Sequence, residues 1–124
     1  IIMKKLQLEE FACIYKYIKL VQSSKLTQTE AGELLHQLHG NISLNSFRGY
    51  YYPTYKKMCS GEIIRGSIPL GLRKFFLDKI YEDLGKEGLI LALASFRQTI
   101  EYYSSKKVSK KKDIILYEEY AKKI

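Results

Sequence analysis

His36 and His39 are the only histidines in the chain, and their spacing is the closest that the sequence comes to a metal-binding pattern. Side chains three residues apart on a helix lie on the same face, so the two imidazoles could point the same way. Zinc sites in proteins need three or four ligands, and two histidines alone make a weak site. We therefore interpret them as a pair at the end of a helix, and we expect no metal and no other cofactor.

The acidic residues also lack the arrangement of a catalytic pair. The three closest pairs are direct neighbours: Glu9 with Glu10, Glu82 with Asp83, and Glu118 with Glu119. Neighbouring side chains on a helix point to different faces, so such a pair cannot share the work of general acid–base catalysis at one site. The phosphate-binding, dinucleotide-binding and nucleophile-elbow glycine motifs are absent as well. We expect that this chain is not an enzyme.

Positive charge is the feature of the composition that points most directly to a partner. Lys and Arg number 21 against 13 Asp and Glu, which gives a formal net charge of +8. Such an excess attracts polyanions, and nucleic acid is the first candidate. The chain has no run of about 18 apolar residues and no signal-peptide pattern, and its two cysteines are best read as reduced thiols. We expect a cytoplasmic protein with no membrane partner.

Residues 46–58, "SFRGYYYPTYKKM", combine four tyrosines with three basic side chains. At about 100° per residue on a helix, they divide into two faces. The inner face, expected in the core, contains Phe47, Tyr50, Tyr51, Thr54, Tyr55 and Met58. The outer face contains Arg48, Gly49, Tyr52, Pro53 and Lys56, which suit phosphates and base edges. The alternative is that the outer face is an ordinary solvated helix surface.

The apolar spacing predicts an all-α fold, a single domain over residues 1–124 built as a compact bundle of about six helices. The expected helices cover residues 8–21, 28–39, 43–60, 69–84 and 87–104 and the C-terminal part of 106–124. Thr27 with Glu30 resembles a capping box at the start of the second helix. Gly61 and Gly85 are expected to end the third and the fourth. Hairpin turn signals between alternating runs are absent, so no strands are expected.

The second and third expected helices have the order of a helix-turn-helix, in which the first supports the second in the major groove. The connection between them is longer than the usual turn, so we predict a helix-turn-helix-like variant. The candidates for base-edge contacts are Asn45, Ser46 and Arg48, with Tyr52 on the same outer face. Lys56, Lys57 and Arg65 are the candidates for phosphate contacts.

A lysine-rich connector is expected at residues 104–112, before the last helix. Its basic side chains are Lys106, Lys107, Lys110, Lys111 and Lys112. One interpretation is a flexible strap that lies along DNA phosphates, with Lys110, Lys111 and Lys112 as contacts. The other is a solvated connector with no binding role.

The runs "SFRGYYYPTYKKMCSGEIIRGSI" and "FFLDKIYEDLGKEGLILALASFRQTIEYY" resemble the N-terminal helical region of bacterial HNH-type restriction endonucleases. The resemblance covers roughly residues 26–104. It implies a DNA-targeting module of a nuclease, including one that reads modified DNA. Two histidines cannot supply an HNH centre, and the chain ends about where the nuclease would begin. We therefore expect an excised domain or a stand-alone relative.

The sequence thus predicts a module that binds double-stranded DNA and directs a nuclease domain, a nuclease subunit or another bacterial defence effector. The alternative belongs to a different class: an interaction or oligomerisation adaptor with an exposed Tyr and Arg surface, since both residues are enriched at interface hot spots. A continuous basic surface would favour DNA. Dispersed lysines around an apolar patch would favour a protein partner.

Overall fold

The computed structural model describes residues 5–65 and 68–124, and every regular element in these two ranges is a helix. The described residues contain no strand, so the predicted all-α class is confirmed. The chain forms two compact units, residues 1–53 and residues 54–124. The finer expectation, one domain built as a bundle of about six helices, stays a prediction.

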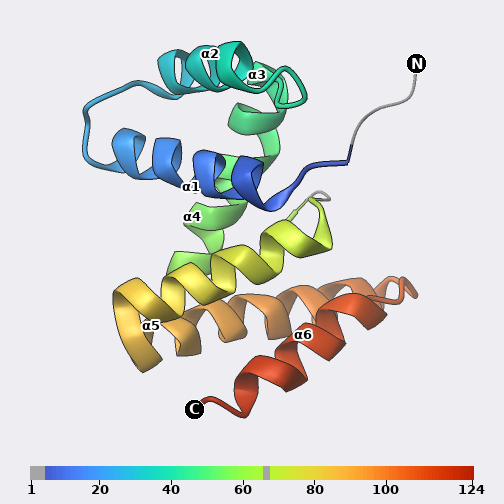
Figure 1. Ribbon diagram of the computed structural model, residues 1–124. Coiled ribbons are helices and arrows are strands. Elements are labelled where there is room, and N and C mark those ends of the chain that lie inside the picture. Colours follow the sequence, from blue (N-terminus) through green and yellow to red (C-terminus); the bar gives the residue numbers. More distant parts are fainter. Residues whose placement is uncertain (1–4, 66–67) are drawn as a thin grey trace. The chain divides into compact units, whose positions relative to one another are not determined.

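In the first unit, helices α1 (Leu8–Gln22) and α2 (Gln28–Leu38) are antiparallel neighbours (Figure 1). The predicted capping box begins α2. Thr27 Oγ1 accepts the Glu30 N–H at 3.1 Å, and the Thr27 N–H donates to Glu30 Oε1 at 3.0 Å. Hydrogen bonds from the Thr27 backbone N–H and from the Thr27 side chain hold the pKa of the Glu30 carboxyl below its usual value. The start of α2 was therefore correctly predicted from residues 27 to 30 alone.

Helix α3 (Leu44–Ser46) begins at Ser43, whose hydroxyl accepts the Ser46 N–H at 3.0 Å. It packs against α2 at Gly32, where an added Cβ would lie 3.4 Å from Leu44 Cα and closer still to the Leu44 side chain. The missing side chain at Gly32 lets the two helices approach. The π-helix η1 (Phe47–Tyr51) follows α3 directly and also contacts α2.

Apolar side chains at helical spacing are buried in these elements. They are Ile14 and Ile18 of α1, Ala31 and Leu35 of α2, Ile42, and Phe47 and Tyr51 of η1. The buried carboxylate of Glu10 accepts the Gln7 N–H at 2.8 Å and the Asn41 side-chain amide at 3.4 Å. Glu10 therefore caps α1 and also ties it to the segment between α2 and α3.

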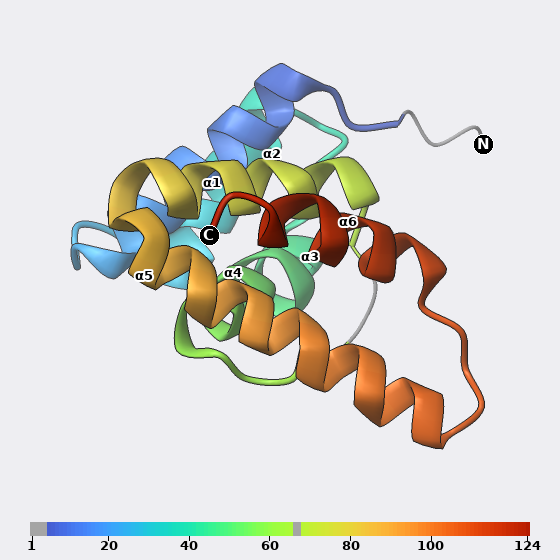
Figure 2. The same ribbon diagram turned by 90° about the horizontal axis from the view of Figure 1, so that it is seen from below.

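Helix α4 (Tyr52–Ser60) begins two residues before the boundary and ends at Gly61, as predicted. In the second unit, the two helices expected at 69–84 and 87–104 fall in one element, α5 (Leu70–Ser105). Gly85 interrupts it with φ 68° and ψ −158°, a conformation that is almost restricted to glycine. The two halves of α5 fold back beside each other (Figures 1 and 2).

Helix α6 (Lys111–Ala121) packs on α5 (Figure 2). A buried ion pair joins them, in which Arg73 Nη1 donates to the Asp113 carboxylate. Near the other end of α6, the buried Tyr120 accepts a hydrogen bond from Lys74 Nζ at 3.0 Å and donates to Asp78. These contacts fix α6 on α5 at both of its ends.

Candidate nucleic-acid interface

A π-helical turn lies in the middle of the tyrosine-rich stretch. The Tyr52 N–H donates to the carbonyl of Phe47, five residues back instead of four. One extra residue in the turn changes the direction of the side chains that follow, and such turns are frequent at functional sites. The prediction for Tyr50, which lies within this turn, was wrong. Its side chain is 47% exposed, whereas the other five residues of the expected inner face are buried.

The base-edge candidates in the first unit differ in their exposure and in their contacts with neighbouring side chains. Asn45 and Arg48 are exposed on α3 and η1. Ser46 is half-buried, and its hydroxyl accepts the Ser43 hydroxyl hydrogen at 2.9 Å and hydrogen-bonds Tyr51. Tyr52 is half-buried beside Phe47, with ring centroids 6.2 Å apart. Asn45 and Arg48 are therefore the two side chains available to a ligand, and Ser46 mainly supports the turn.

Burial raises the pKa of the Tyr51 hydroxyl, the hydrogen bond from Ser46 opposes this rise, and the nearby Glu10 carboxylate adds to it. Tyr51 is therefore a neutral core residue. Gly49, between Arg48 and the tyrosines, is exposed, and an added Cβ would meet no atom within 4 Å in the described structure. The surface beside Arg48 is consequently low and open.

The phosphate candidates of the second unit lie on α4 and the segment after it. Lys56 is exposed, Lys57 is half-buried and Arg65 is exposed. The segment before Arg65 is fixed to α5, because the Ile64 N–H donates to Thr99 Oγ1 at 2.9 Å and Gln98 donates to the Gly61 carbonyl at 2.8 Å. Two hydrogen bonds to α5 therefore hold the segment that leads to the exposed Arg65.

The lysine-rich segment makes defined contacts in the structure. Helix α5 extends to Ser105 and α6 begins at Lys111, so the connector is residues 106–110, shorter than the predicted 104–112. Its first residues form a tight turn, in which the Val108 N–H donates to the Tyr103 carbonyl at 2.8 Å. Lys110 Nζ lies 4.3 Å from the ring centroid of Tyr103, a cation–π contact. Lys111 and Lys112 are exposed in the first turn of α6.

The structure brings Lys110, Lys111 and Lys112 together around a surface hollow of about 890 Å³. The remaining lining residues are Ile68, Pro69, Leu70, Arg73, Ser109 and Asp113. The sequence did not predict a role for Arg73. It lies in "PLGLRKFF", and this stretch has the pattern of an ordinary amphipathic helix. Its partner Asp113 is 40 residues away, and no local signal connects the two.

The histidines have structural positions. His36 Nδ1 lies 3.0 Å from the carbonyl oxygen of Ile42, and His39 follows the last residue of α2. In residues 5–65 and 68–124, no group of three His, Cys, Asp or Glu side chains is close enough to hold a metal ion. Among the helices that the structure describes, none has the length and apolar composition needed to span a membrane.

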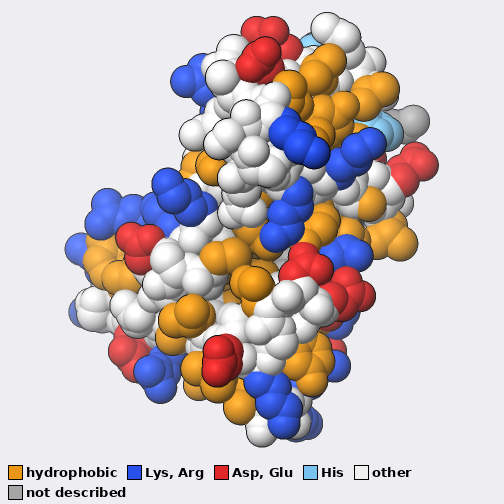
Figure 3. Space-filling view, turned by 90° about the vertical axis from the view of Figure 1, so that its left-hand side faces the viewer, with side chains coloured by type: hydrophobic (Ala, Val, Ile, Leu, Met, Phe, Trp, Pro, Cys, Tyr) orange, Lys and Arg blue, Asp and Glu red, His pale blue; other side chains and the backbone are white. Residues whose placement is uncertain are grey.

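Charge is dispersed on the face of the molecule drawn in Figure 3. Lys and Arg side chains form several separate groups there, with hydrophobic and a few acidic side chains between them.

Comparison with protein-family models, with curated proteins and with solved structures gives no match for this chain. The endonuclease resemblance therefore stays a prediction, and the function has to be argued from the residues themselves.

Proposed function

We propose that this protein binds double-stranded DNA. The observation that carries the proposal is a set of exposed basic side chains that make no ion pair within the described part of the chain: Arg48, Lys56, Arg65, Lys111 and Lys112. A paired surface charge has part of its field cancelled by its partner, whereas an unpaired one keeps its attraction for phosphate. The formal net charge of +8 acts in the same direction.

Within this proposal, α2, α3 and η1 act as a helix-turn-helix-like element. Helix α2 is the support, and α3 with η1 enters the major groove. The five residues 39–43 form the connection. Asn45 and Arg48 are the base-reading side chains, because amide and guanidinium groups pair with adenine and guanine edges respectively. The open surface at Gly49 leaves room for the DNA backbone.

The effector that such a module would direct is a nuclease or another component of bacterial defence. This part of the proposal is supported by the resemblance of residues 26–104 to the helical region of HNH-type restriction endonucleases. The chain itself would supply recognition in the cytoplasm, without catalysis. The proposed targets include DNA that contains modified bases.

The test is a titration of fluorescently labelled duplexes, with and without modified cytosines, by fluorescence anisotropy at several salt concentrations. If about five phosphates are neutralised, log affinity should fall against log salt with a slope of roughly −4 to −5. Absence of binding at low salt, or a binding constant that does not change with salt, would contradict the proposal.

A second candidate function is supported by the dispersed charge and by exposed apolar side chains. Leu34 and Leu38 are 38% and 60% exposed, one helical turn apart on α2, and Tyr50 is exposed on η1. Such a surface fits a protein partner or a second copy of the chain. Sedimentation velocity of the wild type and of Leu34→Ser/Leu38→Ser distinguishes the two functions. A dimer abolished by these changes, together with a lack of DNA binding, would favour the adaptor.

A further inference from the structure

The lining of the lysine-lined hollow in the second unit is part cationic and part apolar. Lys110, Lys111 and Lys112 contribute the positive charge, and Ile68, Pro69 and Leu70 contribute apolar surface. Its volume of about 890 Å³ lies within the range of small-molecule sites, about 300–1,000 Å³, and exceeds what an inorganic ion needs. The ion pair of Arg73 with Asp113 cancels two of the charges at the hollow. The three lysines make no ion pair with any described residue, so the hollow is strongly positive.

The first residues of α6 line this hollow. Helix α6 begins at Lys111 with Lys110 as its N-cap residue, and no side chain caps it. In contrast, Thr27 caps α2 and Ser43 caps α3. The first N–H groups of a helix have no intrahelical acceptor, and with the helix dipole they favour an anion. Since Lys110 cannot accept a hydrogen bond through its side chain, these donors are left for a ligand or for water.

Arg73 provides an independent indication of a ligand. Its side chain lines the hollow and the residue is only 7% exposed, yet its Nε has no hydrogen-bond partner in residues 5–65 and 68–124. Only Nη1 is engaged, by Asp113. A buried donor without an acceptor is unfavourable, and few remain in native proteins. An oxyanion in the hollow would supply the missing acceptor.

We propose that this hollow is a binding site for an organic phosphate. The phosphate oxygens accept hydrogen bonds from the first N–H groups of α6 and from Arg73 Nε, and Lys111 and Lys112 balance the charge. The organic part lies against Ile68, Pro69 and Leu70. Two sources share this chemistry: a phosphodiester of bound DNA, and the phosphate monoester of a free or terminal nucleotide. The site does not depend on the proposed DNA-binding function, because its donors are present without DNA.

The experiment is an NMR titration of the isotopically labelled full chain at constant ionic strength. The probes are inorganic phosphate, a nucleoside 5′-monophosphate, the same nucleoside without phosphate, and a DNA duplex that lacks terminal phosphates. Saturable shifts are expected at the amides of residues 111–113 and at Arg73 Nε–H with the monophosphate, and none with the nucleoside. Shifts with the duplex alone would identify a phosphodiester as the source. Shifts with the monophosphate alone would identify a monoester.

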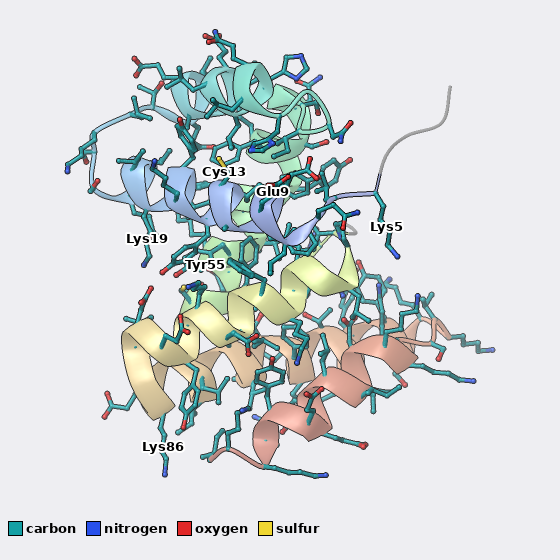
Figure 4. The ribbon with its side chains drawn as sticks, viewed as in Figure 1. Lys5, Glu9, Cys13, Lys19, Tyr55 and Lys86 are labelled. Atoms are coloured by element: carbon teal, nitrogen blue, oxygen red, sulfur yellow. The ribbon has the colours of Figure 1, made fainter. Side chains whose placement is uncertain are left out.

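Two double variants distinguish binding at this specific site from nonspecific attraction to positive charge. Lys111→Gln/Lys112→Gln should weaken phosphate binding by about tenfold or more, as expected for losing charge-assisted contacts. The control, Lys86→Gln/Lys122→Gln, removes the same charge from exposed positions outside the lining. Figure 4 shows Lys86 pointing away from α5 near its bend. The control should keep the wild-type affinity within about twofold.

Three outcomes would overturn the proposal: shifts that do not saturate, shifts spread over lysines throughout the chain, or equal losses in the two double variants. Neither double variant changes a buried side chain, so both should fold. A failure of duplex binding with retained monophosphate binding would contradict the DNA proposal and leave the phosphate site standing.

Discussion

At the scale of single residues, the structure makes Arg48 the sharpest test of sequence readout. Arg48 is exposed on η1 beside the open surface at Gly49. If it reaches a base edge, Arg48→Ala should cost roughly 1 to 3 kcal/mol on the preferred duplex and much less on random DNA. Lys111→Ala should weaken binding to both duplexes alike, because phosphates carry no sequence information. The measurement is a paired titration of both variants. Equal losses on both duplexes for Arg48→Ala would reduce it to a phosphate contact.

Tyr120 gives a prediction for the pH dependence of stability. Burial, followed by the hydrogen bond to Asp78, raises the pKa of its hydroxyl to about 12, while the hydrogen bond from Lys74 opposes the rise. The unfolded value is about 10, so the folded state holds this proton more tightly. The contribution of Tyr120 to the free energy of unfolding is therefore complete below pH 10 and is lost as the pH rises toward 12.

Chemical denaturation between pH 9 and about 12 measures this effect. Tyr120→Phe should lose part of the wild-type decline in stability over this interval, because it has no hydroxyl to ionise. Tyr117→Phe, on the same helix, is the control and should follow the wild type. Identical profiles for wild type and Tyr120→Phe would contradict the assignment.

At the scale of elements, two adjacent tyrosines of the π-turn differ in exposure. Tyr51 is 9% exposed and Tyr50 is 47% exposed. Tyr51→Ala should lower the free energy of unfolding by about 3 kcal/mol, as truncations of buried aromatic side chains do. Tyr50→Ala is the matched control, with an expected loss below about 1 kcal/mol. Thermal and chemical denaturation of both variants would show whether the side chains were assigned to the correct faces.

The bend in α5 depends on one backbone conformation. Gly85 has φ 68° and ψ −158°, and an added Cβ would meet no described atom within 4 Å. Gly85→Ala should therefore destabilise the protein through backbone strain alone, by about 1 to 3 kcal/mol. Gly49→Ala also adds a Cβ to open space, but at a helical position without positive φ, and should be neutral or slightly stabilising. Equal losses of stability in the two variants would show that backbone strain at Gly85 does not cause the destabilisation.

At the scale of the whole molecule, the positive charge is unevenly distributed between the units. Residues 54–124 carry 15 Lys and Arg against 9 Asp and Glu, whereas residues 1–53 carry 6 against 4. In the DNA proposal, most phosphate contacts then come from the second unit and base readout from the first. Lys111→Gln/Lys112→Gln should make the salt slope shallower by about two, and Lys86→Gln/Lys122→Gln should leave it unchanged. A matching change in the control would mean that net charge alone sets the slope.

Much of the secondary structure was predictable from the sequence because its signals are local. The capping box at Thr27 and Glu30, the helix end at Gly61 and the interruption at Gly85 each depend on a few neighbouring residues. The exposure of Arg48 and Lys56 also followed from helical spacing. Local hydrogen bonding and backbone sterics decide such features before any distant segment packs.

Tertiary structure alone decided the rest. The exposure of Tyr50 depends on what packs against η1, and the apolar spacing of the stretch does not contain that information. Arg73 and Asp113 meet across 40 residues when α6 packs on α5. The same packing brings three consecutive lysines and the apolar residues at and just before the start of α5 into the lining of one hollow. A pairing between distant segments depends on how whole helices pack, and no short stretch of sequence contains that information.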